Sequence, residues 1–171
     1  MDDRAILADL FSRVREHVDA VLDGLETDDL FLAAAPDTNP IGWLVWHLTR
    51  IEDAQVADLL DVPQVWIADE TGDWPARFGL EPDPANHGYG HSPAEVAEVR
   101  PDSVPALRDY YGAVARTTQD ALRVIGPTTL DRVVDPHWDP PVTMGVRLVS
   151  IADDQLRHCG QAAYLRGLLK I

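Results

Sequence analysis

Apolar residues recur at spacings of three and four positions in four separate stretches of the chain, which predicts four amphipathic helices. The first covers about residues 3–24, the third starts near Ser103, and the fourth covers about residues 146–169. The second starts at Asn39, which is suited to cap it, followed by Pro40 at its first helical position. The predicted inward stripes are Leu7, Leu10, Val14, His17, Val21 and Leu25 in the first helix, Ile41, Leu44, Leu48, Ile51 and Leu59 in the second, and Val104, Leu107, Tyr111, Val114, Ala121, Leu122 and Ile125 in the third.

A long connection, residues 62–102, separates the second predicted helix from the third and is rich in proline. Long connections without regular structure are uncommon in compact domains unless they serve a function, such as covering a site. Within it, the sequence SPAEVAEV predicts a short helix that Ser92 caps. A second irregular segment, VVDPHWDPPVTM, predicts a small hairpin before the fourth helix. The residues expected to anchor the long connection on the bundle are Trp66, Trp74, Phe78 and Tyr89.

This order of elements predicts an all-α fold, a four-helix bundle with one long crossover between its second and third helices. The chain has 171 residues, of which 46% are hydrophobic and 25% charged, as in ordinary globular proteins. Because single domains commonly contain about 100–200 residues, we expect one domain over residues 1–171.

The charge of the chain narrows the classes of partner. A net charge of −15 opposes binding to nucleic acids and to anionic membrane surfaces. No stretch approaches the ~18 consecutive apolar residues that a membrane span needs. The start, MDDRAILADLF, is acidic where a secretory signal would be basic, and the single cysteine, Cys159, cannot form a disulfide within the chain. These features predict a cytoplasmic protein without nucleic-acid or membrane partners.

One histidine interrupts the most apolar part of the second helix, NPIGWLVWHL. Leu44 and Ile51 lie three residues before and four residues after His47, so its imidazole is expected to face the interior. In the fourth helix, Asp154 and His158 are four residues apart and share a face. Because burying such groups unpaired is costly, they are expected either to pair by hydrogen bonds or to bind a metal. Spacing alone leaves both interpretations open.

The other histidines are weaker candidates. His17 is expected to pack or to lie at the bundle rim, and His137 to be solvated. His87 and His91, in the sequence NHGYGHS of the crossover, either lie over the pocket or are solvated; of the two, His91 is the preferred functional candidate.

Residues of the fourth helix beside the proposed ligands also have structural explanations. Gln161, three residues after His158, either hydrogen-bonds to the site or simply packs. Cys159 points away from the neighbouring His158 and is expected to fill the core. Arg157 and Arg166 are expected to be surface charges, with contact to an anionic substrate or thiol as the alternative.

The segments NPIGWLVWHL and DDQLRHCGQAAYLRG resemble the DinB/YfiT-like superfamily. The similarity extends through QVWIADETGDWPARFGL and GYGHSPAEVAEVR, and it is nearest to the branch that contains mycothiol-dependent maleylpyruvate isomerase and related thiol S-transferases. The resemblance implies a divalent metal bound by His47, Asp154 and His158, mycothiol as a cosubstrate, and homodimers. Many members have a histidine where this chain has Asp154, and the isomerase branch has a glutamate.

Two imidazoles and one carboxylate are a ligand set for zinc, with nickel, iron or manganese as alternatives. The resulting hypothesis is a metal-dependent enzyme that activates a low-molecular-weight thiol, or water, for transfer to or isomerisation of a small electrophile. Two alternatives stay open: a bundle that holds a structural metal or a small ligand without catalysis, and a metal-free network of buried hydrogen bonds. The sequence assigns no catalytic residue beyond the three metal ligands.

Overall fold

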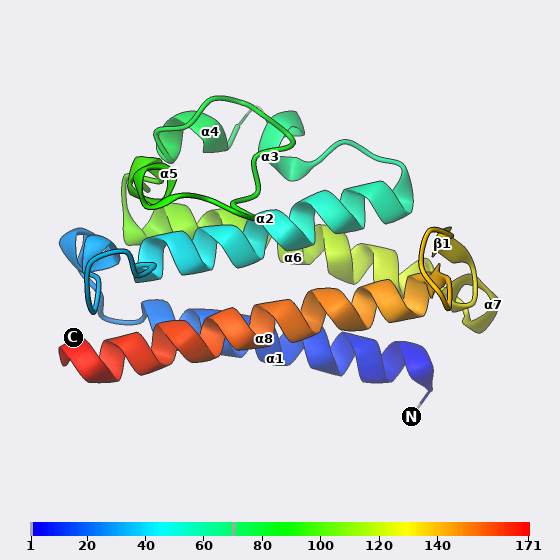
Figure 1. The fold of residues 1–171 in the computed structure, drawn as a ribbon. Coiled ribbons are helices and arrows are strands. Elements are labelled where there is room, and N and C mark those ends of the chain that lie inside the picture. Colours follow the sequence, from blue (N-terminus) through cyan, green and yellow to red (C-terminus); the bar gives the residue numbers. More distant parts are fainter. Residues whose placement is uncertain (1, 70) are drawn as a thin grey trace.

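The structure is a computed structural model that describes residues 2–69 and 71–171. Four long helices, α1 (Asp3–Leu22), α2 (Ile41–Leu60), α6 (Val104–Val124) and α8 (Met144–Leu169), form a bundle. Each packs against two others, in the closed order α1, α6, α2, α8 (Figure 1). The predicted all-α bundle with a long crossover is therefore confirmed.

Shorter elements lie in the connections. The 3-10 helix η1 (Thr27–Phe31) precedes α2, whereas α3 (Val65–Ala68), α4 (Trp74–Arg77) and α5 (Pro93–Glu98) belong to the crossover, which lies over α2 and α6 (Figure 1). Between α6 and α8 come α7 (Pro127–Leu130) and an antiparallel pair of strands, β1 (Val133–Asp135) and β2 (Val142–Thr143), so the predicted short helix and hairpin are both present. Within the described residues, no helix is both long enough and apolar enough to span a membrane.

The start of α2 differs from the starts of the other long helices. Side chains cap α1, α6 and α8, for example through the Ser103 hydroxyl, which accepts a hydrogen bond from the Ala106 amide. In α2 the first helical residue is Ile41, so the capping position falls on Pro40, which has no side-chain acceptor. The prediction that Asn39 caps this helix is wrong, and the first amides of α2 have no side-chain cap within the described residues.

The buried face of α1 also differs from the predicted stripe. His17, placed on the inner stripe by its spacing, is exposed, and the neighbouring Val18 is buried in its place. Phe11 is likewise buried, whereas Leu10 is only partly so. Two stripes one residue apart both have helical spacing, and the one with the greater apolar area faces the core because its burial stabilises the fold more.

Aromatic residues of the crossover hold it on the bundle. Trp66 and Phe78 are buried, and their rings lie 5.4 and 5.7 Å from the ring of Tyr110 in α6. Trp74 packs on the same tyrosine with ring centroids 5.2 Å apart. Tyr89, the fourth predicted anchor, is 85% exposed, so that prediction is wrong. The crossover is thus packed down by three of its aromatic side chains.

Candidate metal centre

The structure brings together His47 from α2 and Asp154 and His158 from α8. One ligand atom from each residue can be chosen so that all three atoms lie within 4.8 Å of one another. The Nε2 atom of His158 is 3.5 Å from the Oδ1 atom of Asp154, and the two imidazole rings meet edge to face with centroids 4.8 Å apart. His47 is buried, whereas the side chains of His158 and Asp154 are 17% and 36% exposed, so the site is closed on the α2 side and open on the α8 side.

Both imidazoles are held through their Nδ1 atoms. The Nδ1 atom of His47 lies 2.5 Å from the carbonyl oxygen of His87, and that of His158 lies 2.8 Å from the amide oxygen of Gln161. Since these oxygens only accept hydrogen bonds, each Nδ1 carries a hydrogen, and in the neutral imidazole Nε2 keeps its lone pair. Such outer contacts orient metal-binding histidines in proteins. Gln161 therefore contacts the site, as one of its two sequence interpretations predicted.

The electrostatics of the three residues fit a cation. Burial lowers the pKa of His47 to about 4, which keeps it neutral and able to ligate at neutral pH. Burial alone would raise the pKa of Asp154, but its interaction with His158 lowers it. Burial alone would lower the pKa of His158, but its contacts with Asp154 and Gln161 raise it, so a cation would have to displace a proton from this imidazole. The Oδ2 atom of Asp154 is buried without a hydrogen-bond partner among the described residues. A buried unpaired carboxylate oxygen is costly, and a bound cation would satisfy it. The donor set could therefore hold a divalent metal.

The glycine at position 88 lets the crossover approach His47. Gly88 has a φ of +89°, in the region that favours glycine. A Cβ atom there would lie 2.9 Å from Nδ1 of His47 and 2.8 Å from Cζ3 of Trp46. The crossover backbone thus lies directly against the candidate ligand, and a residue with a side chain would not fit without movement.

Comparison with known proteins identifies the family. The sequence model of the mycothiol S-transferases matches residues 6–170. The chain belongs to this family. Among solved structures, a conserved protein from Enterococcus faecalis is similar, with a TM-score of 0.87 and 31% identity over 98% of this chain and 97% of that chain. No curated protein matches the chain. The resemblance inferred from sequence is confirmed.

In this mycothiol S-transferase family member, an indole packs on the candidate ligand. The ring of Trp43 stacks on that of His47, with centroids 4.6 Å apart and planes 11° apart. The Nε1 group of Trp43 donates a hydrogen bond to Nδ1 of His91 at 3.2 Å. The Nε2 group of His91 in turn donates to the side-chain oxygen of Asn86 at 2.9 Å. His91 thus belongs to the layer behind His47, whereas His87 hydrogen-bonds to His47 through its backbone carbonyl.

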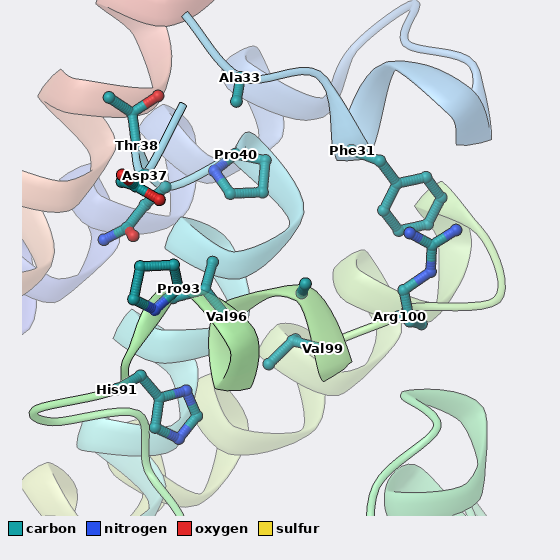
Figure 2. Close-up of a pocket in the computed structure, with 12 residues that line it drawn as sticks. Phe31, Ala33, Asp37, Thr38, Pro40, His91, Pro93, Val96, Val99 and Arg100 are labelled. Carbon is teal, nitrogen blue, oxygen red and sulfur yellow. The ribbon is translucent and has the colours of Figure 1, made fainter. Parts of the chain in front are cut away.

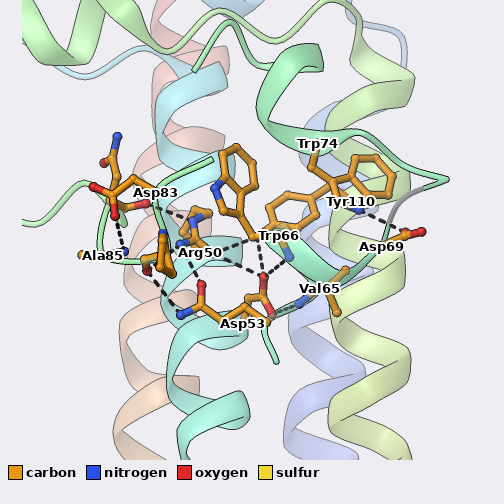
Figure 3. Close-up of polar contacts among 12 residues, drawn as sticks. Arg50, Asp53, Val65, Trp66, Asp69, Trp74, Asp83, Ala85 and Tyr110 are labelled. Atoms are coloured by element: carbon orange, nitrogen blue, oxygen red, sulfur yellow. Dashed lines mark hydrogen bonds and ion pairs between the residues drawn. The ribbon is translucent and has the colours of Figure 1, made fainter. Parts of the chain in front are cut away.

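Sequence reasoning missed the residue that ties the crossover to α2. Arg50 is fully buried and donates hydrogen bonds to the carbonyl oxygens of Pro84 and Asn86, each at 3.0 Å (Figure 3). Its charge is balanced by Asp53, 3.3 Å away in α2. The sequence did contain a signal for this role: Arg50 and Asp53 form a charged pair within a largely apolar helix, and Arg50 follows His47 by three residues. Because Asn86 and His87 are adjacent, Arg50 supports the segment that contacts the candidate ligand.

The remaining sequence candidates lie elsewhere. Cys159 is buried in the core, and burial raises the pKa of its thiol to about 12. Arg157 forms an exposed ion pair one turn away on its own helix. Arg166 donates to backbone carbonyl oxygens at the end of α1 and so joins the two helix ends. His17 and His137 are exposed. None of these five residues is among the donors of the candidate centre.

Proposed function

We propose that the chain is a metal-dependent S-transferase that makes a low-molecular-weight thiol of the mycothiol type react with a small electrophile. The observation that carries this proposal is the arrangement of His47, Asp154 and His158. Both Nδ1 atoms are engaged there, and one buried carboxylate oxygen has no hydrogen-bond partner among the described residues. The family supports the choice of a thiol over water as the nucleophile.

The three side chains would be the protein ligands of the metal. Zinc suits two imidazoles and a carboxylate and retains an open position with three protein ligands; nickel, iron and manganese are alternatives. A divalent cation held there would supply Lewis acidity, which makes a neighbouring thiol easier to deprotonate at neutral pH.

The protein's own residues set the geometry for this chemistry. The His87 carbonyl and the Gln161 amide fix the imidazoles with Nε2 free, so that little reorientation is needed when a cation binds. Trp43 and the crossover cover the α2 side and keep water from His47. The partly exposed Asp154 leaves the α8 side accessible, and there the thiol and the electrophile would approach.

Elemental analysis tests the metal assignment. The protein would be purified without chelator or polyhistidine tag, as wild type and as His47→Ala, His158→Ala and the matched control His137→Ala, which removes an exposed histidine. We expect near-stoichiometric divalent metal in the wild type and the control, and its loss in the other two variants. Absence of metal after addition of zinc, nickel, manganese and ferrous ions would overturn the site.

Activity is tested separately. The metal-containing wild type would be mixed with mycothiol and 1-chloro-2,4-dinitrobenzene, and both the thioether formed and the chloride released would be followed. We expect thioether formation above the uncatalysed rate in the wild type and His137→Ala, and none above it in His47→Ala. A stably bound metal without turnover of this or other thiol-reactive electrophiles would favour a structural metal.

A further inference from the structure

A cavity of about 340 Å³ lies between the start of α2, the segment after η1, and α5, and its lining includes His91 from the layer behind His47 (Figure 2). We call it the α5 cavity; the lining residues that matter here are Phe31, Asp37, Asn39, His91, Ala97 and Arg100. Its volume lies within the range of about 300–1,000 Å³ that is typical of small-molecule sites. Nothing described above uses this space.

The α5 cavity is separated from the centre by aromatic rings. His91 lines the cavity, and its Nδ1 atom accepts the hydrogen bond from Trp43. Trp43 stacks directly on His47. A molecule in the cavity would therefore touch the imidazole that holds the indole against the candidate ligand.

The cavity has polar ends and an apolar middle. In Figure 2, Asp37 and Arg100 lie at opposite ends, with Val96 and Val99 between them. Their opposite charges balance, so the lining favours hydrogen-bonding groups over a net charge of either sign.

Two polar side chains of the lining, those of Asn39 and Arg100, have no hydrogen-bond or ion-pair partner among the described residues. The side chain of Asn39 makes no hydrogen bond within the described part of the chain, and α2 starts beside it without a side-chain cap. The guanidinium of Arg100 lies 3.9 Å from the ring centroid of Phe31 and, among described residues, forms no ion pair, although the chain carries a net charge of −15. Donors are thus available at both ends of the cavity.

We propose that the α5 cavity binds the polar, non-reacting part of the thiol cosubstrate, an uncharged group rich in hydrogen-bonding atoms. This inference rests on the proposed function, since it takes the thiol as a substrate of the adjoining centre. A small apolar electrophile would leave the donors and acceptors at both ends unsatisfied, which weakens binding. A thiol with a polar body would satisfy them, and its sulfur would approach the centre from the partly exposed side of Asp154 and His158.

Two alanines of α5 provide a matched test. Ala97 lines the cavity and Ala94 does not, yet both are exposed on the same short helix. Binding of mycothiol, and of its S-methyl derivative, which has no ionisable thiol, would be measured by calorimetry with zinc-loaded and with metal-free protein. We expect Ala97→Trp to raise the Kd of both compounds at least about tenfold in both forms of the protein, a loss of about 1.4 kcal/mol, and Ala94→Trp to leave it unchanged. Asn39→Ala and Arg100→Gln give the same test, with weaker effects, if Ala97→Trp does not fold.

The outcomes separate the two proposals. If the zinc-loaded wild type fails to bind mycothiol, the proposed thiol-transferase function is overturned, and the cavity assignment falls with it. If the wild type binds mycothiol but Ala97→Trp binds it equally well, only the cavity assignment is overturned. The cavity assignment is also overturned if Ala97→Trp raises the KM for the electrophile and not the KM for the thiol.

Discussion

The Nδ1 atom of His47 lies 2.5 Å from the carbonyl oxygen of His87, although the two residues are 40 positions apart in the sequence. A side chain of α2 is therefore oriented by the backbone of the crossover. The contact sets the tautomer of the neutral imidazole and leaves Nε2 as the nitrogen available to a cation. Changes in the crossover should consequently alter metal affinity without altering a ligand.

Gly88→Ala is expected to disturb this contact. The added Cβ atom would meet Nδ1 of His47 at 2.9 Å, and the positive φ adds strain of about 1–2 kcal/mol. Gly90→Ala is the matched control, since Gly90 has a similar φ of +78° but open space around the Cβ position. We expect both variants to lose stability in urea unfolding and only Gly88→Ala to lose zinc affinity. Equal zinc affinity in the two variants would show that the approach of the crossover does not affect the site.

Gln161→Ala is expected to weaken metal binding with little effect on the fold. Its amide oxygen holds Nδ1 of His158, and loss of such an outer contact typically costs about 10–100-fold in metal affinity. Gln161 is exposed, so the metal-free protein should unfold within about 0.5 kcal/mol of the wild type. Competition with a chromogenic zinc chelator measures the affinity, and Gln119→Ala in α6 is the control. Unchanged affinity in Gln161→Ala would mean that the hydrogen bond plays no part in orienting His158.

Helical periodicity predicts the bundle and an inward position for each of His47, Asp154 and His158, whereas the prediction that the three residues meet rests on the bundle and on the family resemblance. Each of the three residues has apolar neighbours three, four or seven positions away, and a closed bundle directs such positions inward. Periodicity fails where two stripes compete, as for His17 and Val18 in α1.

Contacts made by backbone atoms are harder to predict. Any residue can supply the carbonyl oxygen that His47 uses, so the residue type at position 87 carries no signal for it. Helix ends are also hard to predict. The helix α2 starts one residue later than expected, so Pro40 and not Asn39 occupies its capping position. Arg50 was overlooked for a related reason: two of its five hydrogen-bond partners are crossover carbonyls, which become neighbours only in the folded chain.

Arg50→Met is expected to destabilise the protein strongly. It would leave the buried Asp53 without its counter-charge and the carbonyl oxygens of Pro84 and Asn86 without a donor. Breaking a buried pair in this way costs about 3–5 kcal/mol. Arg123→Met removes an exposed pair and should cost less than about 1 kcal/mol. Urea unfolding measures both, and hydrogen exchange should show faster opening of residues 84–88 in Arg50→Met. Exchange there at the wild-type rate would contradict the anchoring role of Arg50.

A second buried acid, Glu52, joins three helices of the bundle. Thr118 of α6 donates a hydrogen bond of 2.5 Å to its Oε1 atom, and Gln155 of α8 donates to its Oε2 atom. Glu52 is fully buried, and burial raises the pKa of its carboxyl from 4.5 to about 7, despite these hydrogen bonds. The folded protein therefore holds a proton that the unfolded chain releases at a lower pH.

Because the pKa of Glu52 is higher in the folded than in the unfolded chain, the free energy of unfolding falls as the pH rises. The contribution of protonated Glu52 is fully present below the unfolded pKa of 4.5 and is lost as the pH rises through about 7. Each unit of difference corresponds to about 1.4 kcal/mol, so the loss approaches about 3 kcal/mol at alkaline pH. Glu52→Gln keeps a neutral hydrogen-bonding side chain and should be more stable than the wild type at about pH 9, but not at about pH 5. Urea unfolding of both proteins across this range measures the difference, with Glu16→Gln, an exposed site in α1, as the control for lost charge. A difference that stays constant with pH would show that Glu52 is ionised in the folded protein.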